Sequence, residues 1–507
     1  MSAAETSPAV PPSPAGEPRP LTAATAGVGH RPPVRIVHLG LGAFHRAHQA
    51  WYTERTGDGW GIAAFTGRSP EAAEQLAAQD GLYTLVERAA DGDRHQLITA
   101  VVEAHDGADL QTLSGLLASP DTAVVTLTIT EAGYRLASDS HDDGAGPRLD
   151  GADPLVAGDV AALRAHGIGG VTTDGAGPEN VDGTRVRTAA GRLVVGLAAR
   201  RAAGAGPLAV VPCDNLPAND AAARAALLGT ARLVDAELAD WIEATVSFVG
   251  TSIDRITPRT TDADRSSVAA ATGFADAVPV VTEPFSSWIL AGDFPAGRPA
   301  WEHAGAVFVR DLEPFERRKL WLLNGAHSLL AYAGQLRGHA TVAEALADPA
   351  VAGWVEDFWN AAERHLTAPE LDVPAYRAAL RERFANPRIA HHLAQIGNDG
   401  SLKLAARALP VYRAERDAGR DGAAALRPVA AWMDQMTAQV TAGIPIADPS
   451  ADRIDTAVDT GRSGTGQTDT DQTAALLAVV DPALARDEQT VAAVAALRAG
   501  SRTTVRR

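Results

Sequence analysis

The feature that most constrains the fold is a regular alternation of short β-branched runs with alanine-rich stretches. Runs rich in Val, Ile and Leu cover residues 34–39, 61–66, 123–129, 208–212 and 245–249, and helical patterns lie between them. This alternation is typical of a parallel sheet, because parallel strands need long crossover connections. From about residue 313 onward helical patterns dominate, at 315–337, 351–366 and 376–384. We therefore predict an α/β doubly wound domain followed by a mostly α-helical domain.

Composition limits the class of protein and of partner. The chain of 507 residues is 46% hydrophobic and carries a net charge of −17, with 62 acidic against 45 basic residues. Such a charge disfavours nucleic acid or an anionic membrane as the partner. A single cysteine, Cys213, excludes an intrachain disulfide and favours a reducing compartment. No run approaches the roughly 20 apolar residues of a membrane span. We expect a cytoplasmic monomer or small homo-oligomer that acts on small molecules.

The stretch HLGLGAFHRAH, residues 38–48, places glycines where the first strand should turn into a helix. Unpaired N–H groups and the helix dipole favour an anion at such a turn, and a pyrophosphate fits. Gly40 would allow the tight turn, and Gly42 would let the phosphate approach the backbone. However, His45 stands where the dinucleotide fingerprint has its third glycine. Taken alone, the pattern also fits an ordinary strand-to-helix turn.

A longer string, GLGAFHRAHQAWYT, resembles the signature of the polyol-specific long-chain dehydrogenases, which include mannitol 2-dehydrogenases and fructuronate reductases. Further blocks match in the same order, over about residues 34–440: LTITEAGYR from 127, VPCDNLPAN from 211, SIDRITP from 252, EPFSSWI from 283, FERRKLWLLNGAHSLLAY from 315 and RFANPRIAHHLAQIGNDGSLKL from 383. The resemblance implies an NAD(P)-dependent oxidoreductase without a metal that interconverts a ketose or keto-uronate and its polyol at C2. The pairs would be fructose and mannitol, or fructuronate and mannonate.

Composition and patterning predict the domains, and the resemblance implies the cofactor site. We expect a disordered tail at 1–33, a dinucleotide-binding Rossmann-type domain at 34–308 and a helical substrate and catalytic domain at 309–507. Within these, 139–182 reads as a surface insertion with one helix, and 455–472 as a mobile loop. The implied cofactor-binding residues are Gly40, Gly42, Phe44, His45, Arg46, Arg68 and Glu131. For His45 and Arg46 a purely structural role at the start of the helix is the alternative.

The catalytic candidates are Lys319, Asn324 and His327. On an α-helix these three fall within about 140° of one another, so they can line one pocket. Oxidation of an alcohol needs a base for the hydroxyl proton and donors for the developing alkoxide, and a lysine serves as base if burial lowers its pKa. The family pattern K-x4-N-x2-H implies that Lys319 is the general acid/base, Asn324 stabilises the reacting oxygen and His327 donates a hydrogen bond to substrate. Glu316, one turn before Lys319, could relay the proton to water.

Two residues from the first domain are assigned to the same pocket. Asn215 follows the strand at 208–212, at the carboxyl edge where doubly wound sheets bind ligands. By resemblance it pairs with Asn324 to hold the reacting oxygen. Asp254, in SIDRITP, would orient the site or the substrate hydroxyls; an ion pair with Arg255 is the alternative.

Substrate and cofactor preference are less constrained. Lys403 matches a substrate-binding lysine of the family, but Gln395 stands where mannitol 2-dehydrogenases have an arginine. This favours a sugar acid such as fructuronate over fructose, although Lys403 could also bind only a carbonyl or a hydroxyl. After the second strand, Arg68 occupies a position that contacts the adenosine ribose. We expect NAD, with NADP as the alternative.

Two other functions stay open at this point. A phosphorylated hexose could use the cation of Lys403, which would make the chain a mannitol-1-phosphate 5-dehydrogenase. A dinucleotide-binding sensor without catalysis is the other alternative. A sensor would have no need of Lys319, Asn324, His327 and Asn215 together. No metal is expected, because the paired histidines at 45/48 and 391/392 lack accompanying ligand motifs.

Overall fold

The computed structural model describes residues 17–137, 146–168, 185–460 and 469–505. The chain forms two compact units, Met1–Leu312 and Glu313–Arg507, called here the sheet unit and the helical unit. The division falls four residues after the expected boundary between 308 and 309. The two units are described separately.

The sheet unit is built on a parallel sheet of six strands in the order β6-β3-β2-β7-β8-β9. Numbered along the sheet's own chain order, this is the 3-2-1-4-5-6 arrangement of Rossmann-type domains, whose connections reverse direction between β2 and β7. The predicted doubly wound sheet is confirmed; only β6 was absent from the predicted set. The strands are β2 (Val34–Leu39), β3 (Gly61–Phe65), β6 (Val101–His105), β7 (Val124–Leu127), β8 (Leu208–Pro212) and β9 (Val246–Phe248).

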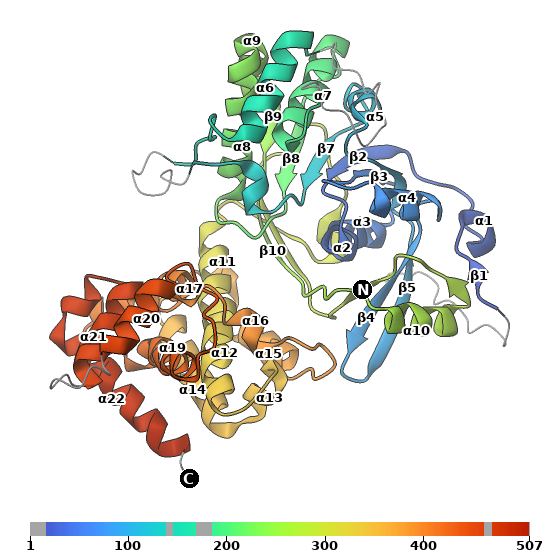
Figure 1. The fold of residues 1–507 in the computed structure, drawn as a ribbon. Coiled ribbons are helices and arrows are strands. Elements are labelled where there is room, and N and C mark those ends of the chain that lie inside the picture. Colours follow the sequence, from blue (N-terminus) through green and yellow to red (C-terminus); the bar gives the residue numbers. More distant parts are fainter. Residues whose placement is uncertain (1–16, 138–145, 169–184, 461–468, 506–507) are drawn as a thin grey trace. The chain divides into compact units, whose positions relative to one another are not determined.

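Both faces of this sheet are covered, which explains the continuous apolar runs of its strands. Successive residues of a strand point to opposite faces. On β2, Val37 and Leu39 belong to one buried cluster and Ile36 to another. The first cluster is packed by α5 (Leu110–Leu117), α7 (Ala189–Ala203), α8 (Asn219–Val234) and α9 (Ala236–Thr245); the second includes residues of α2 (Ala43–Ala47), α3 (Gln49–Thr56) and α4 (Glu71–Ala77). Figure 1 shows these helices around the sheet.

Smaller sheets complete the unit. One joins the hairpin of β4 (Tyr83–Ala89) and β5 (Gly92–Ile98) to β12 (Val280–Thr282). Another has the order β10-β13-β14, formed by Gly250–Asp254, Ser287–Ala291 and Val307–Val309. These strands lie outside the predicted set, because the sequence signals used for the main sheet are weaker there.

The N-terminal stretch differs from the expected disordered tail over its described part, residues 17–33. Strand β1 (Arg19–Pro20) pairs in parallel with β11 (Phe274–Ala275). Helix α1 (Ala23–Ala26) follows and begins with a capping box formed by Thr22. Leu21 is buried against Leu82 and Phe274. The Pro- and Ala-rich composition suggested disorder, but a single buried leucine anchors the segment. Residues 1–16 lie outside the described residues.

Parts of the expected insertion at 139–182, residues 139–145 and 169–182, also lie outside the described residues. Its described part contains the one helix that we expected, α6 (Pro154–His166), capped by Asp153. Asp159 of α6 is buried and accepts hydrogen bonds from Arg187 N and Thr188 N, each at 2.8 Å. This contact ties the insertion to the start of α7.

The helical unit is organised around one long helical segment. It begins as α11 (Glu313–Arg318), continues as the π-helix η3 (Lys319–Gly325) and ends as α12 (Ala326–Leu336). Around it lie α13 (Val342–Ala347), α14 (Pro349–Glu363), α15 (Val373–Phe384), α16 (Leu393–Ile396), α17 (Gly400–Arg407), α18 (Leu409–Asp417) and α19 (Ala423–Ala442). The helices expected at 351–366 and 376–384 correspond to α14 and α15.

The expected loop at 455–472 is helical at both described ends. Helix α20 (Ala451–Thr460) extends into it, and α21 (Asp469–Val480) begins inside it, before α22 (Glu488–Val505). The polar composition hid an apolar pair one turn apart, Ile454 and Val458, both fully buried. Residues 461–468 lie outside the described residues.

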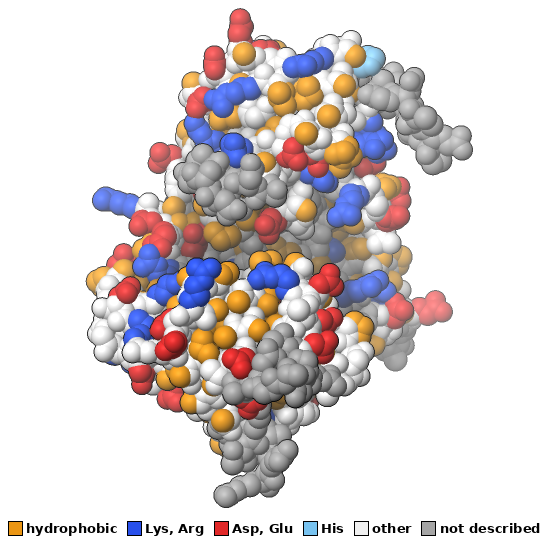
Figure 2. Space-filling model, turned by 60° about the vertical axis from the view of Figure 1, so that its left-hand side comes forward, with side chains coloured by type: hydrophobic (Ala, Val, Ile, Leu, Met, Phe, Trp, Pro, Cys, Tyr) orange, Lys and Arg blue, Asp and Glu red, His pale blue; other side chains and the backbone are white. Residues whose placement is uncertain are grey.

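The visible surface carries side chains of every type. Figure 2 shows acidic and basic side chains interspersed on the visible face, with hydrophobic ones between them. Of the helices described, none has the length and apolarity needed to cross a bilayer.

Candidate active site

The glycine turn after β2 is locked to the neighbouring strand β7. Gly40 has a φ of +108°, and a Cβ there would lie 2.0 Å from the carbonyl oxygen of Thr128. The N–H groups of Gly40 and Leu41 both donate to the carbonyl of Phe65, at 2.9 and 2.8 Å. Thr128 Oγ1 donates to the carbonyl of Gly40 at 2.8 Å. A residue other than glycine at position 40 would push the two strands apart.

The next residues form an uncapped helix start that fits a phosphate group. Gly42 is the N-cap of α2, and no side chain caps this end. The first N–H groups of a helix have no intrahelical partner and favour an anion. A Cβ on Gly42 would meet only the carbonyl oxygen of Gly40, at 3.6 Å. The backbone is therefore open to a ligand at Gly42, whereas Gly40 is needed for the turn itself.

The side chains of His45 and Arg46 hold the turn from inside the protein. His45 is fully buried and stacks on His38 of β2, with ring centroids 3.4 Å apart. Burial and the neighbouring His38 hold the pKa of His45 well below its usual value, so the ring is neutral. Arg46 donates to the carbonyls of Gly42 and Val278. These contacts support the structural alternative for both side chains, so a cofactor contact here would come from the backbone.

Phe44 and His38 complete the turn. Phe44 stacks on His48 at 5.1 Å and packs partly buried against the core. The ring of His38 bonds Thr126 Oγ1 at 2.8 Å and Thr128 Oγ1 at 3.1 Å. Sequence reasoning missed His38, although a histidine inside an apolar strand that enters a glycine turn is a usable signal.

The end of β3 presents Arg68 to solvent. Arg68 is exposed and makes no hydrogen bond or ion pair with any other described residue. Arg192 of α7 stabilises the loop that carries Arg68. It donates to the carbonyls of Thr66 at 3.3 Å and Gly67 at 3.0 Å. Arg68 is therefore available to a ligand at the position where the sheet order places the adenosine ribose.

Asp214 organises the ends of β7 and β8. Its buried carboxylate accepts hydrogen bonds from Ile129 N at 3.2 Å, Thr130 N at 2.7 Å and Tyr134 Oη at 2.7 Å. Burial raises the pKa of this carboxyl. The same loop exposes Glu131, and Asn215, next to Asp214, is exposed after β8. Asp214 thus positions both predicted residues, and sequence reasoning missed it.

Asp254 ends β10 and is half-buried. Its neighbour Arg255 is buried and directs its guanidinium to the carbonyl of Ala47 at 2.7 Å and that of Glu283 at 3.1 Å. Arg255 also lies 3.5 Å from a carboxylate oxygen of Glu87. Its donors are therefore committed to the fold. Asn215 and Asp254 belong to the sheet unit, and their convergence with the residues of the helical unit stays a prediction.

The helical unit places Lys319 and Asn324 in one π-helix. The prediction treated this segment as an α-helix and set the two residues about 140° apart. A π-helix closes on hydrogen bonds between residues five apart, and Lys319 and Asn324 are separated by five. They are therefore about one turn apart and lie on the same side of the helix. Glu316 is half-buried on α11, one turn earlier.

His327 lies two residues beyond the π-helix and is buried, with 8% of its surface exposed. Its Nε2 makes no hydrogen bond within the described residues. The ring packs against Phe384 at 4.7 Å and edge-on to His391 at 4.9 Å. Burial, followed by the charges of His391, Arg383 and Arg407, holds its pKa well below the usual value. A neutral imidazole with one unused nitrogen suits a hydrogen bond to substrate.

Arg407 is a further residue of this region that sequence reasoning missed. It lies on α17 and donates to the carbonyl of Asn324 at 3.4 Å and to Ser328 Oγ at 3.2 Å. Ser328 Oγ also donates to that carbonyl, at 3.2 Å. Arg407 therefore braces the end of the π-helix. Its spacing of four from Lys403 on a helix places both on one face.

Lys403 is already engaged within the protein. Its Nζ donates to the carbonyls of Ile396 at 3.3 Å and Asn398 at 2.6 Å, and lies 3.7 Å from Asp399. Burial and the charge of Arg407 lower its pKa. Gln395 is exposed and makes no hydrogen bond with the described residues. In this structure Lys403 therefore binds backbone carbonyl oxygens. No group of three His, Cys, Asp or Glu side chains suited to a metal ion occurs in the described part of the chain.

Both units of the chain match domain models of one protein family. The Mannitol dehydrogenase Rossmann domain model matches residues 34–303, and the Mannitol dehydrogenase C-terminal domain model matches 311–497. The D-mannonate oxidoreductase of Escherichia coli strain K12 is 38% identical over 411 residues, which cover 79% of each chain. The mannitol 2-dehydrogenase of Cereibacter sphaeroides is 35% identical over 76% of this chain and 77% of its own.

A solved structure agrees in sequence and fold. The Pseudomonas fluorescens mannitol 2-dehydrogenase, in a ternary complex with NAD and D-mannitol, is 33% identical with a TM-score of 0.72, over 97% of this chain and 96% of its own. These matches support an enzyme and not a sensor. The chain therefore belongs to the mannitol dehydrogenase family and is a polyol-type oxidoreductase with a Rossmann dinucleotide-binding domain.

Proposed function

We propose that the protein interconverts a keto-uronate and its reduced sugar acid, of the fructuronate and mannonate type, with NAD as cofactor and Lys319 as general acid/base. One observation carries the proposal: the π-helix aligns Lys319 with Asn324, and the unused Nε2 of His327 lies two residues further on. This set offers one proton carrier and two hydrogen-bonding groups from one segment.

Each group has a distinct task in the reaction. When bound, the dinucleotide supplies or accepts the hydride at C2. In the reducing direction Lys319 Nζ gives its proton to the oxygen of the ketone, which becomes the alcohol; in the oxidising direction it takes that proton back. Asn324 and Asn215 donate hydrogen bonds to the same oxygen, where negative charge develops. His327 binds a neighbouring hydroxyl, and Glu316 passes the proton between Lys319 and water.

The charges around His327 support an acidic substrate. Arg383 and Arg407 both contribute positive potential at His327. Among the described residues, Arg407 donates to the carbonyl of Asn324 and to the hydroxyl of Ser328, and it forms no ion pair with a carboxylate. A half-buried cation without an anionic partner favours an anionic ligand. We propose that a substrate carboxylate pairs with Arg407. The same carboxylate also replaces the backbone carbonyls that now bind Lys403. Gln395 and Asp254 bind substrate hydroxyls.

The cofactor assignment depends on the residues proposed to contact the pyrophosphate, the adenosine ribose and the nicotinamide. The uncapped start of α2 and the open space at Gly42 fit the pyrophosphate. The Pseudomonas fluorescens relative was solved with NAD, which supports NAD here. Arg68 could instead pair with a 2′-phosphate, which supports NADP. Glu131 is proposed to lie near the nicotinamide.

The test is kcat/KM for fructuronate, fructose and fructose 6-phosphate, with NADH and NADPH in parallel. A charge-assisted contact contributes about 1.5 to 3 kcal/mol, so fructuronate is expected to exceed fructose by roughly 10- to 100-fold. Lys403→Met should reduce the ratio of kcat/KM for fructuronate to that for fructose. Some preference should remain, because Arg407 keeps its charge. Fructose as the best substrate, with no change of preference in Lys403→Met, would contradict the sugar-acid assignment. Fructose 6-phosphate as the best substrate would favour the mannitol 1-phosphate alternative.

A further inference from the structure

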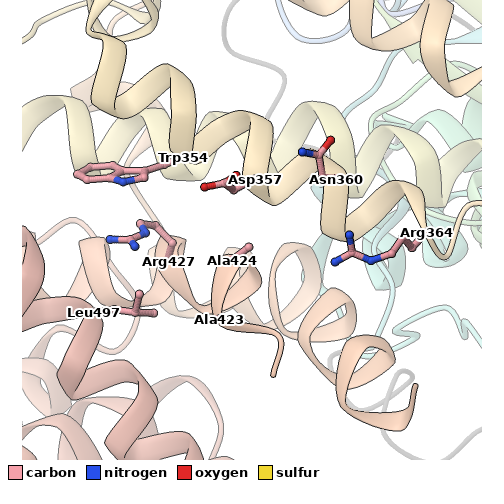
Figure 3. A pocket seen from close by; sticks show the side chains of 8 residues that line it. All are labelled: Trp354, Asp357, Asn360, Arg364, Ala423, Ala424, Arg427 and Leu497. Carbon is pink, nitrogen blue, oxygen red and sulfur yellow. The ribbon is translucent and has the colours of Figure 1, made fainter. Parts of the chain in front are cut away.

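A cavity in the helical unit lies between α14, α19 and α22. Its volume is about 380 Å³, within the range of small-molecule sites. Figure 3 shows its lining: Trp354, Asp357, Asn360 and Arg364 from the region of α14, Ala423, Ala424 and Arg427 from α19, and Leu497 from α22. The predicted catalytic and substrate residues are absent from this lining.

Arg427 is the cation that points to a ligand. Its guanidinium carbon lies 4.8 Å from the centroid of the Trp354 ring. It is half-buried, and burial lowers its pKa, yet it makes no hydrogen bond and no ion pair with any described residue. A guanidinium stacked on an aromatic ring keeps its N–H donors in the plane, where they can take a carboxylate in a bidentate fork. Trp354 therefore holds the guanidinium in place and leaves its donors available.

Arg364 supplies a second cation at the other end of the cavity. In Figure 3 its guanidinium points into the space between the helices. Arg364 pairs with Glu415, but Arg420 at 2.8 Å and His365 at 2.7 Å bind the same carboxylate. One carboxylate thus serves three basic groups, and Asp421 adds negative potential at Arg364.

Asp357 limits the charge and adds an acceptor. It is exposed on the cavity wall and contributes negative potential at Arg427. Asp357 acts on Arg427, and Glu415 and Asp421 act on Arg364, so much of the positive charge is already offset and the cavity suits a ligand with at most one negative charge. The carboxylate of Asp357 can accept a hydrogen bond from a hydroxyl of the ligand. Ala423, Ala424 and Leu497 offer apolar contact to a carbon chain.

We propose that this cavity binds a small hydroxylated carboxylate, with the carboxylate on Arg427 and a hydroxyl on Asp357. The site is separate from the reaction proposed above and does not rest on it. Its ligand class is a monoanion of the hydroxy-acid type. A neutral polyol lacks the group for Arg427, and a dianion meets repulsion from Asp357.

The test is isothermal titration calorimetry on the full chain, with gluconate as probe and sorbitol as its neutral counterpart. Gluconate is expected to bind the wild type and sorbitol to bind at least tenfold more weakly. Arg427→Gln should weaken gluconate binding roughly tenfold or more, since it removes the charge-assisted fork. Asp357→Asn should instead tighten the binding of inorganic phosphate several-fold, because it removes a like charge.

Controls separate this cavity from the reaction site. Lys403→Met should leave gluconate binding at this cavity unchanged, and Arg427→Gln should leave kcat/KM of the polyol reaction unchanged, which also reports folding. Arg427→Lys, which keeps the charge without the fork, should give an intermediate affinity. Equal gluconate affinity in wild type and Arg427→Gln would overturn the proposal. So would binding that is lost in Lys403→Met but kept in Arg427→Gln, or the absence of any gluconate binding.

Discussion

Gly325→Ala is the substitution that most directly tests the role of the π-helix. Gly325 is the last residue of that helix and adjoins Asn324. A Cβ at this position would lie 2.5 Å from Cε1 and 2.6 Å from Cζ of Phe358, a fully buried ring. Overpacking of this kind costs about 1–3 kcal/mol, against a gain of about 0.5–1 kcal/mol from replacing a helical glycine. We expect a net loss of about 1–2 kcal/mol in the free energy of unfolding.

Activity should fall more than stability suggests. The alanine must displace either the ring or the helix that carries Asn324 and His327. Misplacement by about 1 Å costs roughly 100-fold in rate, so kcat should fall roughly 10- to 100-fold. Urea denaturation and steady-state kinetics on the same preparations measure the two effects.

Gly353→Ala is the matched control. Gly353 lies inside α14, is exposed, and a Cβ there would meet no atom within 4 Å. This variant should be slightly more stable than wild type and fully active. Phe358→Leu removes the clashing ring atoms, so the double variant with Gly325→Ala should be more stable than the sum of the single changes predicts, by about 0.5–3 kcal/mol. Additive changes, or a Gly325→Ala variant as active as Gly353→Ala, would refute the steric reasoning.

Three further predictions follow from the two units. Lys319→Ala should reduce turnover by roughly 100- to 10,000-fold while NADH affinity, measured by fluorescence titration, stays near wild type; near-normal turnover would remove Lys319 from the mechanism. Gly40→Ala should abolish dinucleotide binding and lower the melting temperature, because its Cβ would lie 2.0 Å from Thr128 O; an unchanged variant would mean that the turn rearranges freely. Burial lowers the pKa of His38 to about 3, so its contribution to stability is present above the unfolded pKa of about 6.5 and is lost as the pH falls toward 3, by at most about 1.4 kcal/mol per pH unit. In His38→Gln, the free energy of unfolding measured with urea should depend less on pH between 4.5 and 6.5. An unchanged slope would argue against a neutral buried ring.

Much of the sheet was predictable, because its strands are buried on both faces. Continuous apolar runs such as 208–212 then stand out against the alanine-rich helices around them, and the observed β8 has these bounds. Short strands that are stabilised by one contact escaped this logic. Strand β1 and the buried Leu21 belong to a stretch whose Pro and Ala content indicates disorder when read locally. Their stability comes from Phe274, far along the chain.

The candidate site was predictable in its residues but not in its geometry. The pattern K-x4-N-x2-H identifies Lys319, Asn324 and His327, yet an α-helical reading sets Lys319 and Asn324 well apart around the helix axis. The difference is one backbone hydrogen-bond register, which hydrophobic periodicity does not encode. Gly325 is the local sign of it, since a residue without a side chain lets the ring of Phe358 approach the helix.

Two of the residues that sequence reasoning missed share one physical property: each acts on backbone atoms of the site from a position remote in the chain. Asp214 binds the N–H groups of Ile129 and Thr130, and Arg407 binds the carbonyl of Asn324. A motif records side chains that meet a ligand, whereas these groups fix the backbone that carries such side chains. Their loss should therefore change kcat more than cofactor affinity, as expected of groups that position and do not bind. For Arg407 the two tasks coincide, because the cation that braces the π-helix is also the charge that we assign to the substrate carboxylate. Arg407→Lys separates the two tasks, because it keeps the charge but loses the guanidinium hydrogen bonds to the π-helix. This variant should retain the preference for fructuronate over fructose, while turnover falls on both substrates.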